Sequence, residues 1–381
     1  MRIIGTVAGV ALIVLVLVDA FEIILQPRRV IHRFRYARLY YRNTWRVWRA
    51  IALTIRTGKK REGFLSVFGP LSLLGLFAMW VFGLIVGFAL VSWSLRLPIV
   101  SPERVPHFST YVYLSGSTFF TLGYGDVTPA ASLGRALTVM EAGLGFAFLA
   151  IMISYLPVLY QAFSHREVTI SLADARAGSP PTAGEFLLRL GRAGRLEAVD
   201  SFLIEWERWA AELLESHLSF PVLSFYRSQH DNQSWVAVLA MILDTCALLM
   251  VTVKRRSTYQ AQLTFAMARH AAVDLALVLK VRPQDPDQDR SPEKQRQRMR
   301  ELLEEAGHDL HDEAEAAARL AELRRMYEPF LAGLARRFLF TLPPIMPDQP
   351  AADNWQRSAW MPRTPGIGSL PAVADGDDHF R

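Results

Sequence analysis

Long apolar segments divide the first part of the chain. Residues 3–25, 64–95 and 132–163 are each long enough to cross the hydrocarbon core of a bilayer as a helix, at about 1.5 Å per residue. Residues 108–120 are also apolar but too short to cross, so we expect a helix that enters and leaves the membrane on the same side. The pattern predicts an all-α membrane protein with three transmembrane helices and one re-entrant helix.

The second half of the chain has a different pattern, in which apolar positions recur about every 3.6 residues. This period predicts a helical cytoplasmic domain over residues 164–340, with a polar linker at residues 283–292. Residues 341–381 are rich in proline, glycine and polar residues and are expected to form a disordered tail. The predicted helical segments are residues 199–218, 234–253, 258–281 and 293–339.

One of these segments, residues 235–253, is apolar enough to form a fourth membrane span. Asp244 lies at its centre, and the next helix carries Arg269, His270 and Asp274, which leaves no apolar segment for a return crossing. A fourth span would place the C-terminal helices outside the cell. We therefore favour a helix buried inside a cytoplasmic domain, with the fourth span as the alternative.

The distribution of charge sets the orientation of the predicted spans. The chain has a net charge of +6, and residues 26–63 concentrate lysine and arginine around a single acid, Glu62. The positive-inside rule places this segment in the cytoplasm, so the N-terminus is expected outside and the C-terminus inside. Regularly spaced arginines with aromatic residues between them predict a helix that lies on an anionic inner leaflet. These arginines are Arg35, Arg38, Arg42, Arg46 and Arg49.

Two acids, Asp19 and Glu22, lie on one face of the N-terminal transmembrane helix predicted over residues 1–25. Ionisable residues inside a span are costly and indicate a functional site by default, which here would be a proton sensor. Near the headgroups, however, the two acids could pair with arginines of the following segment. We favour that pairing, with Arg28, Arg29 or Arg33 as the partner.

A glycine-bearing motif follows the short apolar helix and reads Thr121-Leu122-Gly123-Tyr124-Gly125-Asp126. Glycine adopts left-handed backbone dihedrals without a Cβ penalty, so glycines at alternate positions let successive carbonyls point towards one axis. An ordinary glycine-rich turn is the alternative, but it does not account for the long apolar segments on both sides. The motif resembles the selectivity filter of the potassium channel family, whose signature is threonine, an aliphatic residue and glycine–tyrosine–glycine, followed by aspartate.

The resemblance implies a pore domain over residues 64–163, with an outer helix, a pore helix, the filter and an inner helix. Potassium is then the permeant ion, bound by backbone carbonyls in place of its water, and no other cofactor is implied. Only one filter motif occurs and no internal repeat is present, so a fourfold ring of carbonyls requires four chains. The expected ligands are Thr121, Leu122, Gly123 and Tyr124, with Gly125 completing the filter.

Four residues are assigned to the support of this filter. Asp126 is expected to tune the outer mouth, and Ser117 stands where some family members carry a glutamate that braces the aspartate. Glu141 lies in the inner helix, where a charge is unexpected. It could hydrogen-bond behind the filter, for instance to Thr118, or pair with a neighbouring subunit.

Three residues of the inner helix are candidates for the gating hinge. Gly145 lies ten residues beyond Arg135, near the position where the family often bends, and Gly143 is a second candidate. Close packing against another helix is an equal alternative for Gly145. Pro157 removes one helical hydrogen bond and is expected to kink the cytoplasmic end.

These features together predict a homotetrameric, potassium-selective channel in a bacterial inner membrane. A less selective monovalent cation channel and a non-conducting receptor or scaffold are the alternatives, and voltage sensing by the arginines of residues 35–49 is a minor one. We find no nucleophile–base set, phosphate loop or metal cluster, so no enzyme is expected. No nucleic-acid partner is expected either. The single cysteine, Cys246, excludes an intrachain disulfide. The sequence names no ligand for the cytoplasmic domain.

Overall fold

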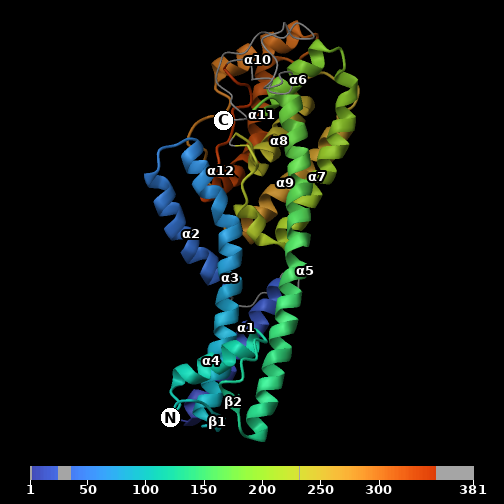
Figure 1. The fold of residues 1–381 in the computed structure, drawn as a ribbon. Helices are drawn as coiled ribbons and strands as arrows, with labels where there is room; N and C mark the ends of the chain where they lie inside the picture. Colours follow the sequence, from blue (N-terminus) through green and yellow to red (C-terminus); the bar gives the residue numbers. More distant parts are fainter. Residues whose placement is uncertain (1, 25–35, 231, 349–381) are drawn as a thin grey trace, which may run out of the picture. The chain divides into compact units, whose positions relative to one another are not determined.

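The computed structural model describes residues 2–24, 36–230 and 232–348 (Figure 1). The chain forms two compact units, Met1–Gln161 and Ala162–Arg381, and is all-α apart from one pair of two-residue strands in the described ranges. Three of its helices are long and apolar enough to cross a membrane, as the sequence predicts. These are α1 (Arg2–Ile24), α3 (Lys59–Ser94) and α5 (Ser132–Ala177).

The first unit is built around α3, which packs extensively against α1, α2 and α4. Helix α1 lies against α3 through glycines that let the two backbones approach closely. A Cβ atom at Gly9 would lie 2.8 Å from the carbonyl oxygen of Gly87, so neither position tolerates a side chain without movement. The other elements of this unit are α2 (Tyr36–Thr54), β1 (Ile99–Val100), α4 (Phe108–Phe119) and β2 (Thr128–Pro129), together with the first part of α5.

Helix α2 packs antiparallel on the first half of α3. The ring of Trp45 lies 4.9 Å from that of Phe68, and Trp48 stacks on Phe64 at 4.4 Å while its indole N–H donates to the Phe64 carbonyl at 3.2 Å. Two of the aromatic residues that lie between the arginines therefore contact α3, where Trp45 is buried and Trp48 is half-buried. The arginines Arg38, Arg42 and Arg46 remain exposed on α2.

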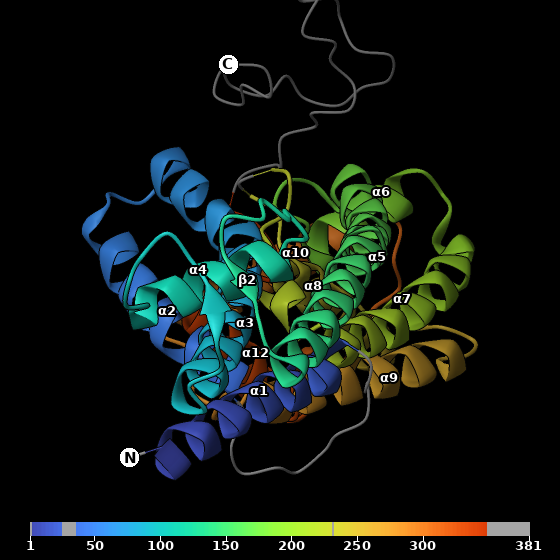
Figure 2. The same cartoon turned by 60° about the horizontal axis from the view of Figure 1, so that its bottom comes forward.

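The second unit is a helical domain gathered around α8 (Trp235–Val251), as Figures 1 and 2 show. Helix α8 contacts α6, α7, α9, α11 and α12, and every residue from Trp235 to Leu249 is buried. It is therefore a core helix of this unit, as the sequence favours. The other elements are the end of α5, α6 (Ala183–Arg192), η1 (Leu196–Ala198), α7 (Val199–Ser219), η2 (Pro221–Phe225), α9 (Tyr259–Val278), α10 (Glu293–Glu305), α11 (Glu313–Arg325) and α12 (Glu328–Phe338).

Two non-helical segments of this unit are more buried than their composition suggests. The polar linker at residues 283–292 contains Arg290, which is only 6% exposed. The disordered tail was predicted to begin at residue 341, and that boundary is too early. Ile345 and Met346 are buried, and the Gly184 amide donates to the Ile345 carbonyl at 2.8 Å. Residues 349–381 of the predicted tail lie outside the described residues.

Candidate functional site

The glycine motif adopts an alternating backbone at the C-terminal end of α4. The main-chain amides of Thr121 and Leu122 donate to the carbonyls of Thr118 and Ser117, at 2.9 and 2.8 Å, so the motif starts directly from the last turn of the helix. Beyond this point φ is positive at every second residue: +55° at Thr121, +61° at Gly123 and +80° at Gly125. Such an alternation turns successive carbonyls towards the same side of the ribbon, as a carbonyl-lined ion path requires.

The single chain leaves this ribbon largely uncovered. A Cβ atom placed on Gly123 or Gly125 would meet no atom within 4 Å. The side chains of Leu122 and Tyr124 are 52% and 68% exposed. Irregular backbone is stable at membrane depth only where protein or a water-filled cavity surrounds it, so the ribbon needs cover from outside its own chain.

The phenol of Tyr113 braces the outer end of the motif. Its hydroxyl donates to Asp126 Oδ2 at 2.9 Å, which links α4 to the residue that follows the second glycine. Ser117 does not take this role with its side chain, because its hydroxyl donates to the Leu114 carbonyl of its own helix at 3.1 Å. Sequence reasoning missed Tyr113, although it lies one helical turn before Ser117 on the same face of α4.

A short antiparallel strand pair ties down the chain on the far side of Asp126. Strand β2 pairs with β1, with Thr128 opposite Val100. The Ala130 amide also donates to the Pro98 carbonyl at 2.9 Å, and the Tyr111 hydroxyl donates to the Leu97 carbonyl at the same distance. Both ends of the glycine motif are therefore anchored, one to α4 and the other to the loop that follows α3.

Helix α5 meets α4 directly behind the motif. Glu141 is 5% exposed and hydrogen-bonds Ser115, not Thr118 as the sequence suggested. Its own chain already covers most of it, and pairing with a neighbouring subunit stays a prediction. One turn later, a Cβ atom at Gly145 would lie 2.3 Å from the Phe119 carbonyl oxygen, so this glycine is a close-packing position.

The other two hinge candidates differ from Gly145 in their surroundings. A Cβ atom at Gly143 would meet nothing within 4 Å, so its surface is open in the single chain. Pro157 lies inside α5, which is a single helix from Ser132 to Ala177. The assignment of Gly143, Gly145 and Pro157 to a gating hinge therefore stays a prediction, and for Gly145 the geometry also supports close packing.

Asp19 of α1 joins three helices of the first unit. It is 5% exposed and accepts hydrogen bonds from the indole N–H of Trp80 in α3, at 2.9 Å, and from the main-chain amide of Ala37 at the start of α2, at 3.2 and 3.3 Å to its two oxygens. A carboxylate at a helix N-terminus satisfies amides that have no partner inside the helix. The predicted partners of Asp19 and Glu22, Arg28, Arg29 and Arg33, lie outside the described residues.

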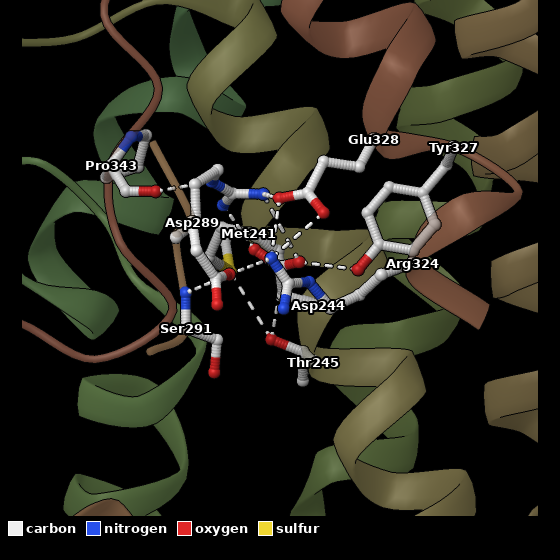
Figure 3. Close-up of polar contacts among 10 residues, drawn as sticks. Met241, Asp244, Thr245, Asp289, Ser291, Arg324, Tyr327, Glu328 and Pro343 are labelled. Carbon is white, nitrogen blue, oxygen red and sulfur yellow. Dashed lines mark hydrogen bonds and ion pairs between the residues drawn. The ribbon is translucent and has the colours of Figure 1, made fainter. Parts of the chain in front are cut away.

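A buried polar network holds the helical unit together, as Figure 3 shows. Asp244 at the centre of α8 accepts from Arg290 at 2.5 Å and from the Tyr327 hydroxyl at 2.6 Å. Arg290 also lies 3.5 Å from Glu328, and its Nε donates to the Pro343 carbonyl at 2.7 Å. Burial raises the pKa of Tyr327 well above its usual range. The network pins residues 283–292 and 343 onto α8 and α12, which is a structural role.

The described residues contain no group of three or more histidine, cysteine, aspartate or glutamate side chains arranged to hold a metal ion. The motif, Tyr113, Ser115, Glu141 and Gly145 all belong to the first unit, and α3, α4 and α5 position them.

Comparisons with known proteins bear on the same region. A family model described as "Ion channel" matches residues 75–161. An uncharacterised membrane protein of Bacillus subtilis, YdjJ, is 26% identical over 180 residues, which cover 46% of this chain and 52% of that protein. Protein LctB of Geobacillus stearothermophilus is 30% identical over 91 residues, or 21% of this chain and 67% of its own length, and LctB of Bacillus caldotenax is 29% identical over the same shares. The match therefore spans about half the length of YdjJ. No solved structure matches.

Proposed function

We propose that this chain, which belongs to the ion channel family, forms a potassium-selective channel with Thr121–Gly125 as its filter. The observation that carries the proposal is the alternation of left-handed φ at Thr121, Gly123 and Gly125. An ordinary turn needs one or two such residues, whereas a ribbon that presents a carbonyl from every residue to one axis needs them at regular intervals.

The proposed ligands are the carbonyls of Thr121, Leu122, Gly123 and Tyr124, with the Thr121 hydroxyl at the inner end. Potassium loses its water only where these oxygens replace it, and the ring must not collapse onto the smaller sodium ion. Hydrogen bonds hold the two ends of the ribbon apart. One joins Tyr113 to Asp126, and the others run from the main-chain amides of Thr121 and Leu122 to α4. They support selectivity by limiting such a collapse.

We infer a homotetramer from the cover that the ribbon lacks. Each chain supplies one filter strand, and four strands around a shared axis would face their carbonyls towards each other. The exposed side chains of Leu122 and Tyr124 would then pack against neighbouring chains on the outside of the ring. Assembly with a related subunit would meet the same demand.

We also infer that α2 contacts an anionic inner leaflet through its arginines. Arg38, Arg42 and Arg46 recur at intervals of four, so they form one stripe, and the α2 segment contains no acid to neutralise them. The contacts of Trp45 and Trp48 with α3 fix the rotation of the helix, and this stripe lies exposed beside that contact. The positive-inside rule then places the N-terminus outside a bacterial inner membrane and the helical unit in the cytoplasm.

Ion flux through the purified full-length protein in liposomes tests the proposal. We expect potassium flux that is at least ten-fold faster than sodium flux, recorded while pH, calcium and nucleotides are varied on the side of the C-terminus. Gly123→Ala should abolish this selectivity, because a Cβ atom is strained at φ +61°. Gly63→Ala is the matched control, since its Cβ atom would meet open space within helix α3.

Each alternative predicts a different result. Equal sodium and potassium flux would indicate a less selective cation channel. Absence of flux under every condition, in a protein that still assembles as a tetramer, would indicate a non-conducting receptor or scaffold. Liposomes with and without phosphatidylglycerol test the arginine stripe, since Arg38→Gln, Arg42→Gln and Arg46→Gln together should weaken only the dependence on the anionic lipid.

A further inference from the structure

Helices α5 and α4 touch at two points that are spaced equally on both. Glu141 and Gly145 are one turn apart on α5, and Ser115 and Phe119 are one turn apart on α4. Glu141 hydrogen-bonds Ser115, and the Cβ position of Gly145 lies 2.3 Å from the Phe119 carbonyl oxygen. Because the two helices meet in this matched register, neither can slide along the other without breaking both contacts.

The hydrogen bonds at Ser115 fix where the protons are. Its hydroxyl has one hydrogen and contacts two oxygens, the main-chain carbonyl of Ile85 at 2.9 Å and the carboxyl of Glu141. The Ile85 carbonyl can only accept. If Glu141 were ionised, one of the two contacts would bring two oxygens together with no hydrogen between them. A protonated Glu141 resolves this, because it donates to Ser115, and Ser115 donates to Ile85.

The surroundings of Glu141 agree with a neutral acid. Its side chain is 5% exposed, and Ser115 is its hydrogen-bond partner among the described residues, with no lysine, arginine or histidine within ion-pairing distance there. A buried carboxylate without a cation costs far more than a buried, hydrogen-bonded carboxylic acid. Asp19 in the same unit is the contrast, because among the described residues an indole N–H and a main-chain amide donate hydrogen bonds to it.

We infer that Glu141 is protonated and that it is a positioning residue. It fixes the position of α4 along the inner helix α5, and with it the position of the filter. The inference rests on the proposed channel function. The hydrogen-bonded path runs from α5 through Ser115 to Ile85 of α3, while the same α4 segment holds the amides of Thr121 and Leu122 through its carbonyls. A shift of α5 during gating therefore reaches the filter through this contact.

Two substitutions of Glu141 separate its shape and hydrogen bond from its charge. Glu141→Gln keeps the length and a donor for Ser115, whereas Glu141→Ala removes both. In full-length protein in liposomes, we expect Glu141→Gln to keep potassium flux and the potassium-to-sodium ratio within about two-fold of wild type. Glu141→Ala should lower that ratio about ten-fold, because one buried hydrogen bond is lost and a cavity forms. Ser115→Ala should change it in the same direction.

Infrared spectroscopy measures the protonation of Glu141 directly, which a purely structural role would not require. Wild type should show a carboxylic acid C=O band at neutral pH that shifts in D₂O and is missing from Glu141→Gln. Absence of this band would overturn the protonated state, and so would a Glu141→Gln channel as impaired as Glu141→Ala. Unchanged selectivity of Glu141→Ala would overturn the positioning role.

The failure of this inference differs from the failure of the proposed function. If wild type carried no potassium flux, the channel proposal would fall, but the infrared comparison would still decide whether Glu141 is protonated. If Glu141→Ala did not assemble, Ser115→Ala and the infrared band would decide in its place.

Discussion

Helices α8 and α3 are both apolar on all sides, yet the molecule covers them very differently. Almost the whole of α8 lies beneath other helices of its own unit. In α3, by contrast, 44% of the most apolar 18-residue window is buried, and the share falls to 28% in α1 and 22% in α5. A run of apolar residues indicates only that the helix is shielded from water. Whether protein, lipid or another subunit provides the cover depends on the rest of the chain.

The acids inside these helices show the same difference between the units. Asp244 of α8 is matched by the full charge of Arg290 and by the Tyr327 hydroxyl. Among the described residues, an indole and a main-chain amide donate to Asp19 of α1, and a serine hydroxyl is the hydrogen-bond partner of Glu141 of α5. The helical unit therefore buries an acid with a cation beside it, whereas Asp19 and Glu141 of the first unit hydrogen-bond neutral groups of the described residues.

The largest effect that tests this comparison is the protection of the single cysteine. Cys246 lies in α8 with 0% exposure, and burial raises the pKa of its thiol, so little thiolate forms. We expect a maleimide to label the native full-length protein at least about a thousand-fold more slowly than the denatured protein, since the unit must open first. The rate is followed by mass spectrometry.

A matched position on a membrane span completes this test. Phe82 of α3 is 65% exposed. A spin label on Phe82→Cys, in a Cys246→Ala background, should be accessible to oxygen dissolved in the bilayer. Rapid labelling of Cys246 in wild type by a lipid-soluble reagent would mean that α8 faces lipid, and the difference between the helices would disappear.

The next largest effect concerns the charge that compensates Asp244. Arg290→Met removes the cation and leaves the carboxylate with Tyr327, so we expect a loss of about 3–5 kcal/mol in the stability of the helical unit. Denaturant unfolding of the full-length protein, followed by circular dichroism, measures the loss. Adding Asp244→Leu should restore part of it, because an apolar pair costs less than one unpaired charge. An unchanged midpoint in the single variant would show that the network carries no stability.

The sequence predicted what depends on local chemistry. The three spans follow from the thickness of a bilayer, and the glycines of the motif follow from the need for left-handed dihedrals at Gly123 and Gly125. The contacts it missed join distant segments: Asp19 to Ala37, Ser115 to Glu141, and Asp244 to Arg290. Such pairs depend on helix packing, which the pattern of apolar and polar residues does not specify.

Two packing details have the same cause. The tryptophans of α2 stand among arginines in a segment whose composition suits a membrane surface, but α3 offers Phe64 and Phe68 at matching positions, and the tryptophans pack on them. Likewise, the segment after residue 341 has a disordered composition, yet Ile345 is buried and hydrogen-bonds the main chain of α6 and of Arg290. The composition of a segment indicates which environments are compatible with it, and its packing contacts determine which of these it occupies.

A smaller effect is expected from acid, which acts on the helical unit through His217. Burial, and then the nearby Arg166, lower the pKa of His217 to about 3. Below its ordinary value of about 6.5, the unfolded chain binds a proton that the folded chain does not, so stability falls as pH decreases. The loss should be about 2 kcal/mol at pH 5 relative to pH 7.5. His217→Gln should lack this part of the slope in denaturant titrations; equal slopes would contradict the buried neutral state.

The smallest expected effect comes from comparing two arginines of one helix, α11. Arg319 pairs with Glu315 at 2.8 Å, and both side chains are 63% exposed, whereas Arg324 pairs with Glu328 at 2.9 Å with exposures of 12% and 8%. Water already solvates the first pair, so Arg319→Ala should change the free energy of unfolding by less than about 0.5 kcal/mol. Arg324→Ala leaves Glu328 and Asp289 short of a cation and should cost more than about 1 kcal/mol. Equal losses of unfolding free energy in the two variants would contradict this comparison. They would mean that burial by protein, which distinguishes α8 from the spans, does not decide how much an ion pair contributes to stability.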